Sequence, residues 1–366
     1  MKKSIKTMLL SLLAVMLLVV TACGGGGSGS GGGAGVSGAP QDSGSPSQAA
    51  DAGANIKERT LKVGIITPQG APQAQGLDKF AQLVSERSGG KMKVQVFYSG
   101  QLGDDKKMME ATQAGLQEMA VITSPTIYGT VKEFGIFDLP YIFQNEKEAD
   151  AIMDGPIADK LMAKLEPHGL IGLALWENGF RNVTNSKHPI EKVEDLKGLK
   201  IRTLPNPIHL EIFKALGANP VAMAWPEVFS ALESGALDGQ ENAIQVIDHE
   251  KVYEVNKYVT LDRHLWSPFA FIFSKKLWDQ MSEEERKILK DAAKEAGVFA
   301  RETNRAKEKQ SLETLKSHGM QVTELSPEVL KQMQDLTRPV IDKFKGEIGE
   351  EIVNELLAEI EKVRNG

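Results

Sequence analysis

Short runs of β-branched and apolar residues alternate with segments of helical periodicity near the start of the main body of this chain. The order is strand Leu61–Ile66, helix Pro72–Arg87, strand Met92–Tyr98, helix Asp104–Ala114 and strand Met119–Ile122. Helices between successive strands return the chain to the same edge of a sheet, so the strands should run parallel. The sequence therefore predicts an α/β domain with its site at the carboxyl ends of the strands.

The same alternation returns after Leu170, and a helical segment follows it. Strands are expected at Ile171–Leu175, Leu199–Arg202, Pro220–Met223 and Phe269–Phe273, with helices at Ile208–Leu216 and Pro226–Leu232. Helices are also expected at Ser282–Arg305, Ser326–Lys345 and Glu347–Val363. Ser282 and Glu285 have the spacing of a capping box. The pattern predicts two α/β lobes followed by a helical C-terminal tail.

The first 54 residues have a different composition from the body. Residues 1–22 read as a secretory signal, with three lysines before an apolar stretch at Met8–Val20 that is too short to span a bilayer. Val20-Thr21-Ala22-Cys23 resembles a bacterial lipobox, so we expect acylation of Cys23, the single cysteine. Residues 24–54 hold 12 Gly and 6 Ser and predict a flexible tether. A plain signal peptide with an incidental cysteine is the alternative.

Charge and residue inventory exclude several function classes. The whole chain carries a formal charge of -6, and loss of the three leader lysines makes the mature chain more acidic. An acidic protein lacks the basic surface of a nucleic-acid binder. One cysteine excludes internal disulfides and cysteine-based zinc sites. The histidines show no metal-ligand spacing and are expected at the surface or at helix ends: His168, His188, His209, His249, His264 and His318.

No nucleophile elbow, phosphate-binding loop or dinucleotide fingerprint occurs in its required context, so we expect no cofactor and no metal. Polar residues instead stand where predicted strands meet loops. Arg181 follows a strand, Arg202 ends one, Asn206 lies just beyond, and Asn242 follows the Asp238–Gly239 turn. A guanidinium at a strand end fits both oxygens of a carboxylate. For any single arginine, pairing with a surface acid is the alternative.

Several sequence blocks carry a family resemblance. They are Gln101–Asp105, Glu177–Arg181 with Thr184–Ser186, Glu194–Arg202, Leu216–Pro220 and Asp238–Asn242. In this order they resemble the solute-binding proteins of tripartite ATP-independent periplasmic (TRAP) transporters, of the C4-dicarboxylate-binding type. The resemblance covers nearly all of Leu61–Gly366.

The resemblance implies a two-lobed periplasmic-binding-protein-like fold, with crossing segments and a long connecting helix. The lobes close on a small organic acid, which a membrane permease then takes up without ATP hydrolysis. We expect lobe I at 55–178 and about 269–305, and lobe II with the C-terminal helices at 179–268 and about 306–366. The protein should be an extracytoplasmic monomer, held at the membrane surface by its lipid alone, and not an enzyme.

By matching motif positions, the resemblance implies a ligand-carboxylate contact for Arg202, a second for Arg181, and amide contacts from Asn206 and Asn242. Trp225 would place a ring against the ligand or pack in the core. In the first lobe the candidates are Thr123 and Ser124, which follow a strand, and Gln69, in the first strand–helix loop.

The chain departs from the family pattern at two places: Ala71 replaces a common histidine, and Ala243 replaces a common proline. The first departure leaves the contacts at the distal end of the ligand open. Asp104 and Asp105 are left out of the predicted site because they would repel a distal carboxylate.

Two other functions stay open at this point. A lipid-anchored enzyme acting on small acids or sugars would need an acid–base or metal constellation that the sequence does not reveal. A binding protein that reports to a sensor kinase would share the same site. The ligand itself, whether a C4-dicarboxylate, a sugar acid or another carboxylate, is not determined by these residues.

Overall fold

The computed structural model describes residues 55–365, which lie in one compact unit that spans Asp51–Gly366. The predicted signal, lipobox and tether therefore lie outside the described residues. Within 55–365, no helix combines the length and the apolar character needed to cross a membrane.

The first part of the unit follows the predicted alternation closely. It comprises β1 (Arg59–Ile65), α1 (Pro72–Arg87), β2 (Met92–Phe97), α2 (Asp105–Ala114) and β3 (Met119–Thr123). β1 pairs in parallel with both β2 and β3, so the prediction of parallel strands is confirmed here. The connecting helix returns the chain each time, which places the carboxyl ends of these strands at one edge.

A second parallel group forms farther along the chain. It contains β5 (Lys200–Thr203), α6 (Pro207–Ala215), β6 (Asn219–Ala222) and β7 (Gly239–Ala243), and β5 pairs in parallel with β6 and β7. The two groups belong to a single sheet with the order β2-β1-β3-β8-β4-β7-β5-β6. The short β9 (Gln321–Glu324) pairs with β8 outside this path.

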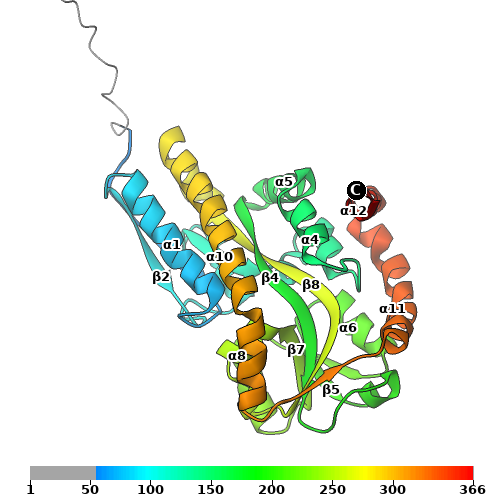
Figure 1. The fold of residues 1–366 in the computed structure, drawn as a ribbon. Helices are drawn as coiled ribbons and strands as arrows, with labels where there is room; N and C mark the ends of the chain where they lie inside the picture. The colour runs from blue at the N-terminus through cyan, green and yellow to red at the C-terminus, as the bar shows by residue number, and fades with distance from the viewer. Residues whose placement is uncertain (1–54, 366) are drawn as a thin grey trace, which may run out of the picture. The chain divides into compact units, whose positions relative to one another are not determined.

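Two long antiparallel strands join the parallel groups. β4 (Leu170–Asn185) and β8 (Tyr258–Ser274) pair along most of their length, with register shifts at three places in the ladder (Figure 1). The sequence predicted only Ile171–Leu175 and Phe269–Phe273 as strands. The rest of β4 and β8 contains buried charged and amide residues, which locally resemble a loop.

Helix α10 (Glu283–Ser317) is the long helix that the resemblance implied. It packs against both α1 and β4 (Figure 1). Trp176 of β4 is fully buried against it and donates a hydrogen bond from Nε1 to the Ala293 carbonyl at 2.9 Å. A Cβ on Gly297 would lie 2.6 Å from Cδ1 of Trp176, so glycine is what allows this close approach. The predicted Ser282–Glu285 capping box is confirmed at its start.

The tail consists of α11 (Pro327–Ile348), which packs on α6, and α12 (Glu350–Asn365), which packs on α4 (Glu146–Met153). Short helices complete the fold: α3 (Ser124–Ile127), α5 (Pro156–Ala163), α7 (Val228–Glu233), α8 (Ile244–His249) and α9 (Lys275–Trp278). Short 3-10 turns lie at Lys132–Asp138, Glu166–His168, Val193–Leu196, Trp225–Glu227 and Val252–Glu254.

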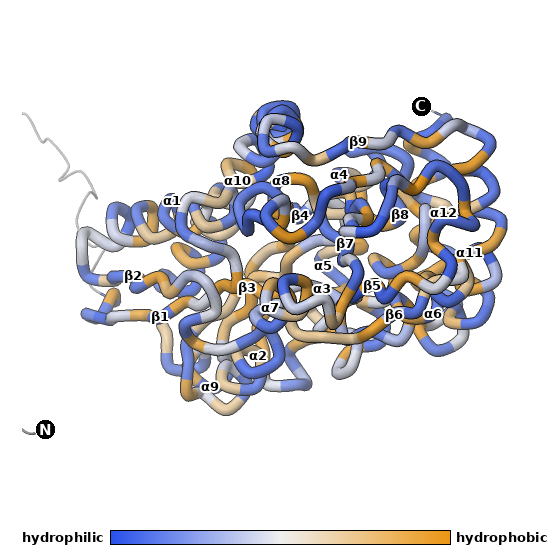
Figure 2. Tube along the Cα trace, turned by 90° about the horizontal axis from the view of Figure 1, so that it is seen from below, coloured by the Kyte–Doolittle hydropathy of each residue, from blue (hydrophilic) through white to orange (hydrophobic). Residues whose placement is uncertain are grey.

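Apolar side chains from both faces of the sheet form the core. Aromatic residues of β8 are prominent in it, because Phe269 and Phe271 are nearly or fully buried and Phe271 packs edge-on against Trp176. Figure 2 shows hydrophobic residues gathered along β3 and its neighbours, with hydrophilic residues along the outer turns of the helices. The central strands are thus covered on both faces, as parallel strands in α/β proteins usually are.

Candidate ligand-binding site

A cavity of about 480 Å³ lies where the strands of the two parallel groups end. Thr67 follows β1, Thr123 ends β3, Arg202 lies at the end of β5, Trp225 follows β6 and Asn242 lies near the end of β7. The cavity therefore lies at the carboxyl ends of the strands, where the sequence predicts the site. A volume of this size suits a small organic ligand.

Arg202 is a buried cation without an ionic partner. Its side chain is 2% exposed, Nε donates to the Met223 carbonyl at 2.9 Å, and the guanidinium lies 5.3 Å from the centre of the Trp225 ring. Among residues 55–365 it forms no ion pair with a carboxylate. Burial lowers the pKa of Arg202 to about 10, so the group is still charged at neutral pH. Such a charge favours an anion in the cavity.

Arg181 also reaches the cavity, but it is already paired. Both Nε and Nη2 donate to the Glu241 carboxylate, with a distance of 2.9 Å between Nη2 and Oε1, and Nη2 also donates to the Glu241 carbonyl. Nη1 has one weak contact, to Ser267 Oγ at 3.5 Å. Arg181 therefore offers a ligand one N–H edge, whereas Arg202 offers both of its terminal nitrogens.

The Arg181–Glu241 pair continues into a buried chain of charges. His264 Nε2 lies 3.2 Å from Glu241 Oε2, and its Nδ1 lies 2.8 Å from Asp262 Oδ2. Burial alone would lower the pKa of His264, but the two carboxylates raise it to about 9. Burial would raise the pKa of Glu241, but the charges of Arg181 and His264 hold it well below its usual range. Two cations and two anions thus compensate each other inside the sheet.

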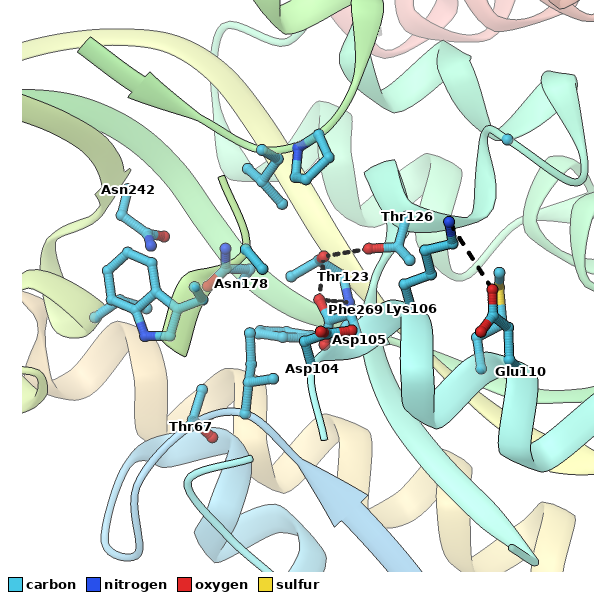
Figure 3. A pocket seen from close by; sticks show the side chains of 18 of the residues that line it. Thr67, Asp104, Asp105, Lys106, Glu110, Thr123, Thr126, Asn178, Asn242 and Phe269 are labelled. Carbon is cyan, nitrogen blue, oxygen red and sulfur yellow. Dashed lines mark hydrogen bonds and ion pairs between the residues drawn. The ribbon is translucent and has the colours of Figure 1, made fainter. Parts of the chain in front are cut away.

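Asp105 is a buried carboxylate on the wall contributed by the first parallel group. Its Oδ2 accepts hydrogen bonds from the backbone N–H and the hydroxyl of Thr123, and that hydroxyl lies 3.1 Å from Thr126 Oγ1 (Figure 3). Its Oδ1 is buried and has no protein partner among the described residues. Burial raises the pKa of Asp105 to about 6, although the hydrogen bonds from Thr123 and the charge of Arg202 act in the opposite direction.

Other polar atoms in the cavity also lack partners. Thr67 Oγ1 and Asn178 Oδ1 are buried and form no hydrogen bond within the described part of the chain. Asn242 uses Oδ1 to accept from the Ala243 N–H at 2.9 Å, and no hydrogen bond of its Nδ2 is present among residues 55–365. Buried polar groups are normally satisfied, so these atoms mark positions where a polar ligand or water completes the site.

The structure brings together five of the residues predicted from the sequence. Arg202, Arg181, Asn242, Trp225 and Thr123 all line the cavity.

The other three predicted ligand contacts lie outside this lining. Asn206 caps α6 and donates to Asp138 Oδ2 at 2.8 Å, Ser124 is buried in α3, and Gln69 is exposed in the loop after β1. Their predicted ligand contacts stay predictions.

Several expectations need correction. Asp104 and Asp105, which are not among the ligand contacts predicted from the sequence, both line the cavity. The Gln101–Asp105 block is the sequence signal for this position, and repulsion by the two acids acts only on a ligand that carries a second carboxylate.

Arg181 and Asn242 were expected next to loops, but they lie within β4 and β7. His209 and His264 were expected at the surface or at helix ends, but both are fully buried beside carboxylates. Among residues 55–365, no group of three or more His, Cys, Asp or Glu side chains is placed to hold a metal ion.

The cavity lies between two parallel groups of strands that long crossing strands connect, and it holds an arginine without an ionic partner among the described residues, as expected of a two-lobed solute-binding protein. The family model for bacterial extracellular solute-binding proteins, family 7, matches residues 63–347. The C4-dicarboxylate-binding periplasmic protein of Rhodobacter capsulatus is 31% identical over 296 residues, which are 80% of this chain and 88% of the relative.

Two solved structures are similar throughout the described unit. The sugar acid binding protein of Advenella mimigardefordensis, in complex with galactonate, has a TM-score of 0.83 and 40% identity over 84% of this chain and 99% of that chain. A TRAP periplasmic solute-binding protein of a Polaromonas species, bound to D-erythronate, has a TM-score of 0.80 and 36% identity over 82% of this chain and 99% of that chain. The chain belongs to the family 7 solute-binding proteins of TRAP transporters, and the resemblance and the two-lobed fold are confirmed.

Proposed function

We propose that this protein captures a small organic acid through an ion pair with Arg202, closes its lobes around it, and delivers it to a membrane permease. The observation that carries the proposal is a buried guanidinium that faces a cavity without an ionic partner among the described residues. A ligand carboxylate would supply the missing charge and accept two parallel N–H bonds. The relatives are extracytoplasmic solute-binding proteins. In this proposal the protein binds its ligand and does not act on it as an enzyme.

In this proposal other cavity residues make secondary contacts with the ligand. Arg181 contributes its Nη1 as a second contact, Asn242 donates from Nδ2, Trp225 lies against the ligand, and Thr123 contacts its distal end. Asn206 is assigned to structure, because it caps α6 and bonds Asp138. Ser124 and Gln69 lie outside the cavity lining, and their ligand contacts stay predictions from the sequence.

A thermal-shift screen of carboxylates tests the function. A ligand that binds only the folded state raises the melting temperature, by an amount equivalent to about 2.7 kcal/mol at 100 times its Kd. We expect at least one small organic acid to produce a saturable shift and its uncharged amide to produce none. If no acid in a broad library shifts the melting temperature, the assignment of a carboxylate ligand is wrong.

We further propose that Cys23 carries a lipid that holds the protein at the outer surface of a membrane. The support is the Val20–Cys23 sequence and the Gly/Ser-rich segment that follows it. In a bacterium that processes lipoproteins, the full chain should sediment with membranes, and Cys23→Ser should move it to the soluble extracytoplasmic fraction. Equal partitioning of both forms would argue against the anchor.

A further inference from the structure

A second cavity, of about 530 Å³, is lined by α5, α10 and the first half of β4. Consecutive β4 residues, Ile171–Leu175, contribute to its lining, and in Figure 1 this part of β4 lies between the two helices. β7 pairs only with the later part of β4, Arg181–Asn185, so no strand among residues 55–365 pairs with this edge of β4 before Arg181. The cavity therefore occupies the position that a further strand of the sheet would take.

The register of the sheet shows which β4 residues direct their backbone groups toward this open edge. The Ser274 N–H donates to the carbonyl that precedes β3, so Ser274 faces β3. Ile272 and Ala270 alternate with Ser274 along β8 and face β3 as well. Their partners in β4, Gly172 and Leu175, therefore direct their N–H and C=O groups away from β8.

Two hydrogen bonds at the ends of this segment agree with that orientation. The Leu170 N–H donates to the Leu165 carbonyl at 3.2 Å, and the Glu177 carbonyl accepts from Gln73 Nε2 at 2.9 Å. Leu170 and Glu177 follow the same alternation, and both bond to groups outside the β4–β8 ladder. The edge between them carries backbone donors and acceptors that another strand can pair with.

The α10 wall of the cavity carries a row of cations. Arg286, Lys290 and Lys294 are spaced four residues apart, so they follow one another along one face of the helix. Within the described residues none of the three forms an ion pair with a carboxylate. Arg286 Nε donates to the Trp278 carbonyl at 3.1 Å, and the Lys290 ammonium lies 5.6 Å from the centre of the Trp278 ring.

The acids of this cavity leave that charge uncompensated. All but one of them form ion pairs within the described part of the chain: Asp154, Glu166, Glu177 and Asp279. The exception is Asp159 on α5. Three unpaired cations on one wall against a single unpaired acid favour an acidic partner.

The spacing of the cations fits an extended chain. A helix rises about 1.5 Å per residue, so successive members of the row lie about 6 Å apart along α10. Alternate side chains of a strand lie about 6.6 Å apart on one face. α10 runs in the same direction as β4, because Trp176 bonds to Ala293 and Asn178 bonds to Asn304 farther along both elements. A strand beside β4 would therefore place acidic side chains at alternate positions opposite the three cations.

The α5 wall suits the side chains that alternate with these acids. Its lining residues are mainly apolar and include Met153, Met162 and Ala163. A Cβ on Gly172 would lie 2.7 Å from Cβ of Met162, so α5 approaches β4 closely. The intervening side chains of a bound strand should be apolar and of modest size.

We propose that this cavity binds an extended peptide of a partner protein, in which acidic residues alternate with apolar ones, as an additional strand on the edge of β4. Backbone pairing with Gly172 and Leu175 supplies affinity, and the alternating side chains supply specificity. The acidic side chains contact the cations of α10, and the apolar ones contact α5. The site is separate from the ligand cavity and does not depend on which acid that cavity holds.

A synthetic peptide tests the proposal on the purified protein at neutral pH. The probe is an acetylated and amidated heptapeptide with glutamate and valine in alternation. We expect saturable binding by calorimetry and slower hydrogen exchange at the amides of Gly172 and Leu175, which the added strand would cover. A peptide of the same composition with its glutamates grouped at one end, and an alternating lysine–valine peptide, should each bind at least tenfold more weakly.

Two N-methylated versions of the probe test strand pairing directly. One carries methyl groups on the glutamate amides and the other on the valine amides. Successive amides of a strand point to opposite sides, so only one of the two sets faces β4. We expect one version to lose binding and the other to keep it.

A pair of variants tests the charge match. Lys290→Gln combined with Lys294→Gln should weaken binding of the probe about tenfold, because each partly exposed pair changes affinity by up to about fivefold. Lys287→Gln combined with Lys316→Gln is the matched control, since both lysines lie on α10 outside the cavity lining. This control should bind the probe with unchanged affinity.

Three results would overturn the proposal. The first is a probe that does not bind at about 1 mM, or that binds without slowing exchange at Gly172 and Leu175. The second is equal affinity in the cavity variant and its control. The third is binding that both N-methylated peptides retain, which would mean that the cavity holds an anion without strand pairing.

Discussion

Replacing Arg202 by alanine is expected to weaken binding of the carboxylate ligand about 100-fold or more. Two charge-assisted hydrogen bonds of about 1.5–3 kcal/mol each would be lost from a buried site. Arg202→Lys should lose about tenfold, because the ammonium keeps the charge but cannot form the parallel pair of bonds. Calorimetry with the acid identified by thermal shift measures both changes.

Although Arg202→Ala weakens binding, it should not lower the stability of the ligand-free protein. Burial lowers the pKa of Arg202, so its charge destabilises the ligand-free protein, and no carboxylate in the described chain pairs with it. Arg202→Ala should therefore keep or raise the melting temperature while binding is lost. Arg263→Ala is the matched control, since Arg263 pairs with Glu146 outside the cavity and its loss should leave affinity unchanged. Near-normal affinity in Arg202→Ala would refute the proposed ion pair.

The second large effect is expected at Glu241. Glu241→Gln leaves the guanidinium of Arg181 buried with no full negative charge beside it, and His264 loses one of its two carboxylates. Breaking a buried pair by removing one partner costs about 3–5 kcal/mol. Chemical denaturation should show this loss of unfolding free energy, and the melting temperature should fall by about 5–10 °C.

Two further variants identify the cause of that loss. Glu355→Gln removes the partner of Lys160 at the surface, where a pair contributes about 1 kcal/mol at most. The double variant Arg181→Met, Glu241→Gln removes the uncompensated cation and should recover part of the stability. If the double variant is no more stable than Glu241→Gln alone, the loss does not come from an unpaired Arg181.

The elements that could be predicted from sequence are those whose pattern is local. Helix α1 occupies the predicted residues, Pro72–Arg87, because its apolar spacing and the Gly89-Gly90 stop lie within the segment itself. The polar parts of β4 and β8 could not be predicted in this way. Arg181 is tolerated inside a strand only because Glu241, 60 residues away, pairs with it, and no local pattern contains that partner.

The residues of the site also differ in whether local sequence could predict them. Arg202 ends a predicted strand and belongs to a recognisable sequence block, so it could be proposed without a structure. The surroundings of Asp105 depend on contacts across the fold, since Thr123 donates to its Oδ2 while its Oδ1 is buried without a partner among the described residues. These contacts are a three-dimensional property that no local sequence pattern contains.

The place of β8 in the sheet has a consequence for how the exported chain folds. β8 lies between β3 and β4 and also pairs with β9, so β3 and β4 each lack one of their two neighbouring strands until Ser274 has emerged. In a chain that crosses the membrane from its N-terminus, more than 200 residues of the described unit, 55–257, emerge before this strand. The sheet must then close through contacts between distant parts of the sequence, which form slowly. Unpaired strand edges in the interim are points where chaperones would protect the nascent protein from aggregation.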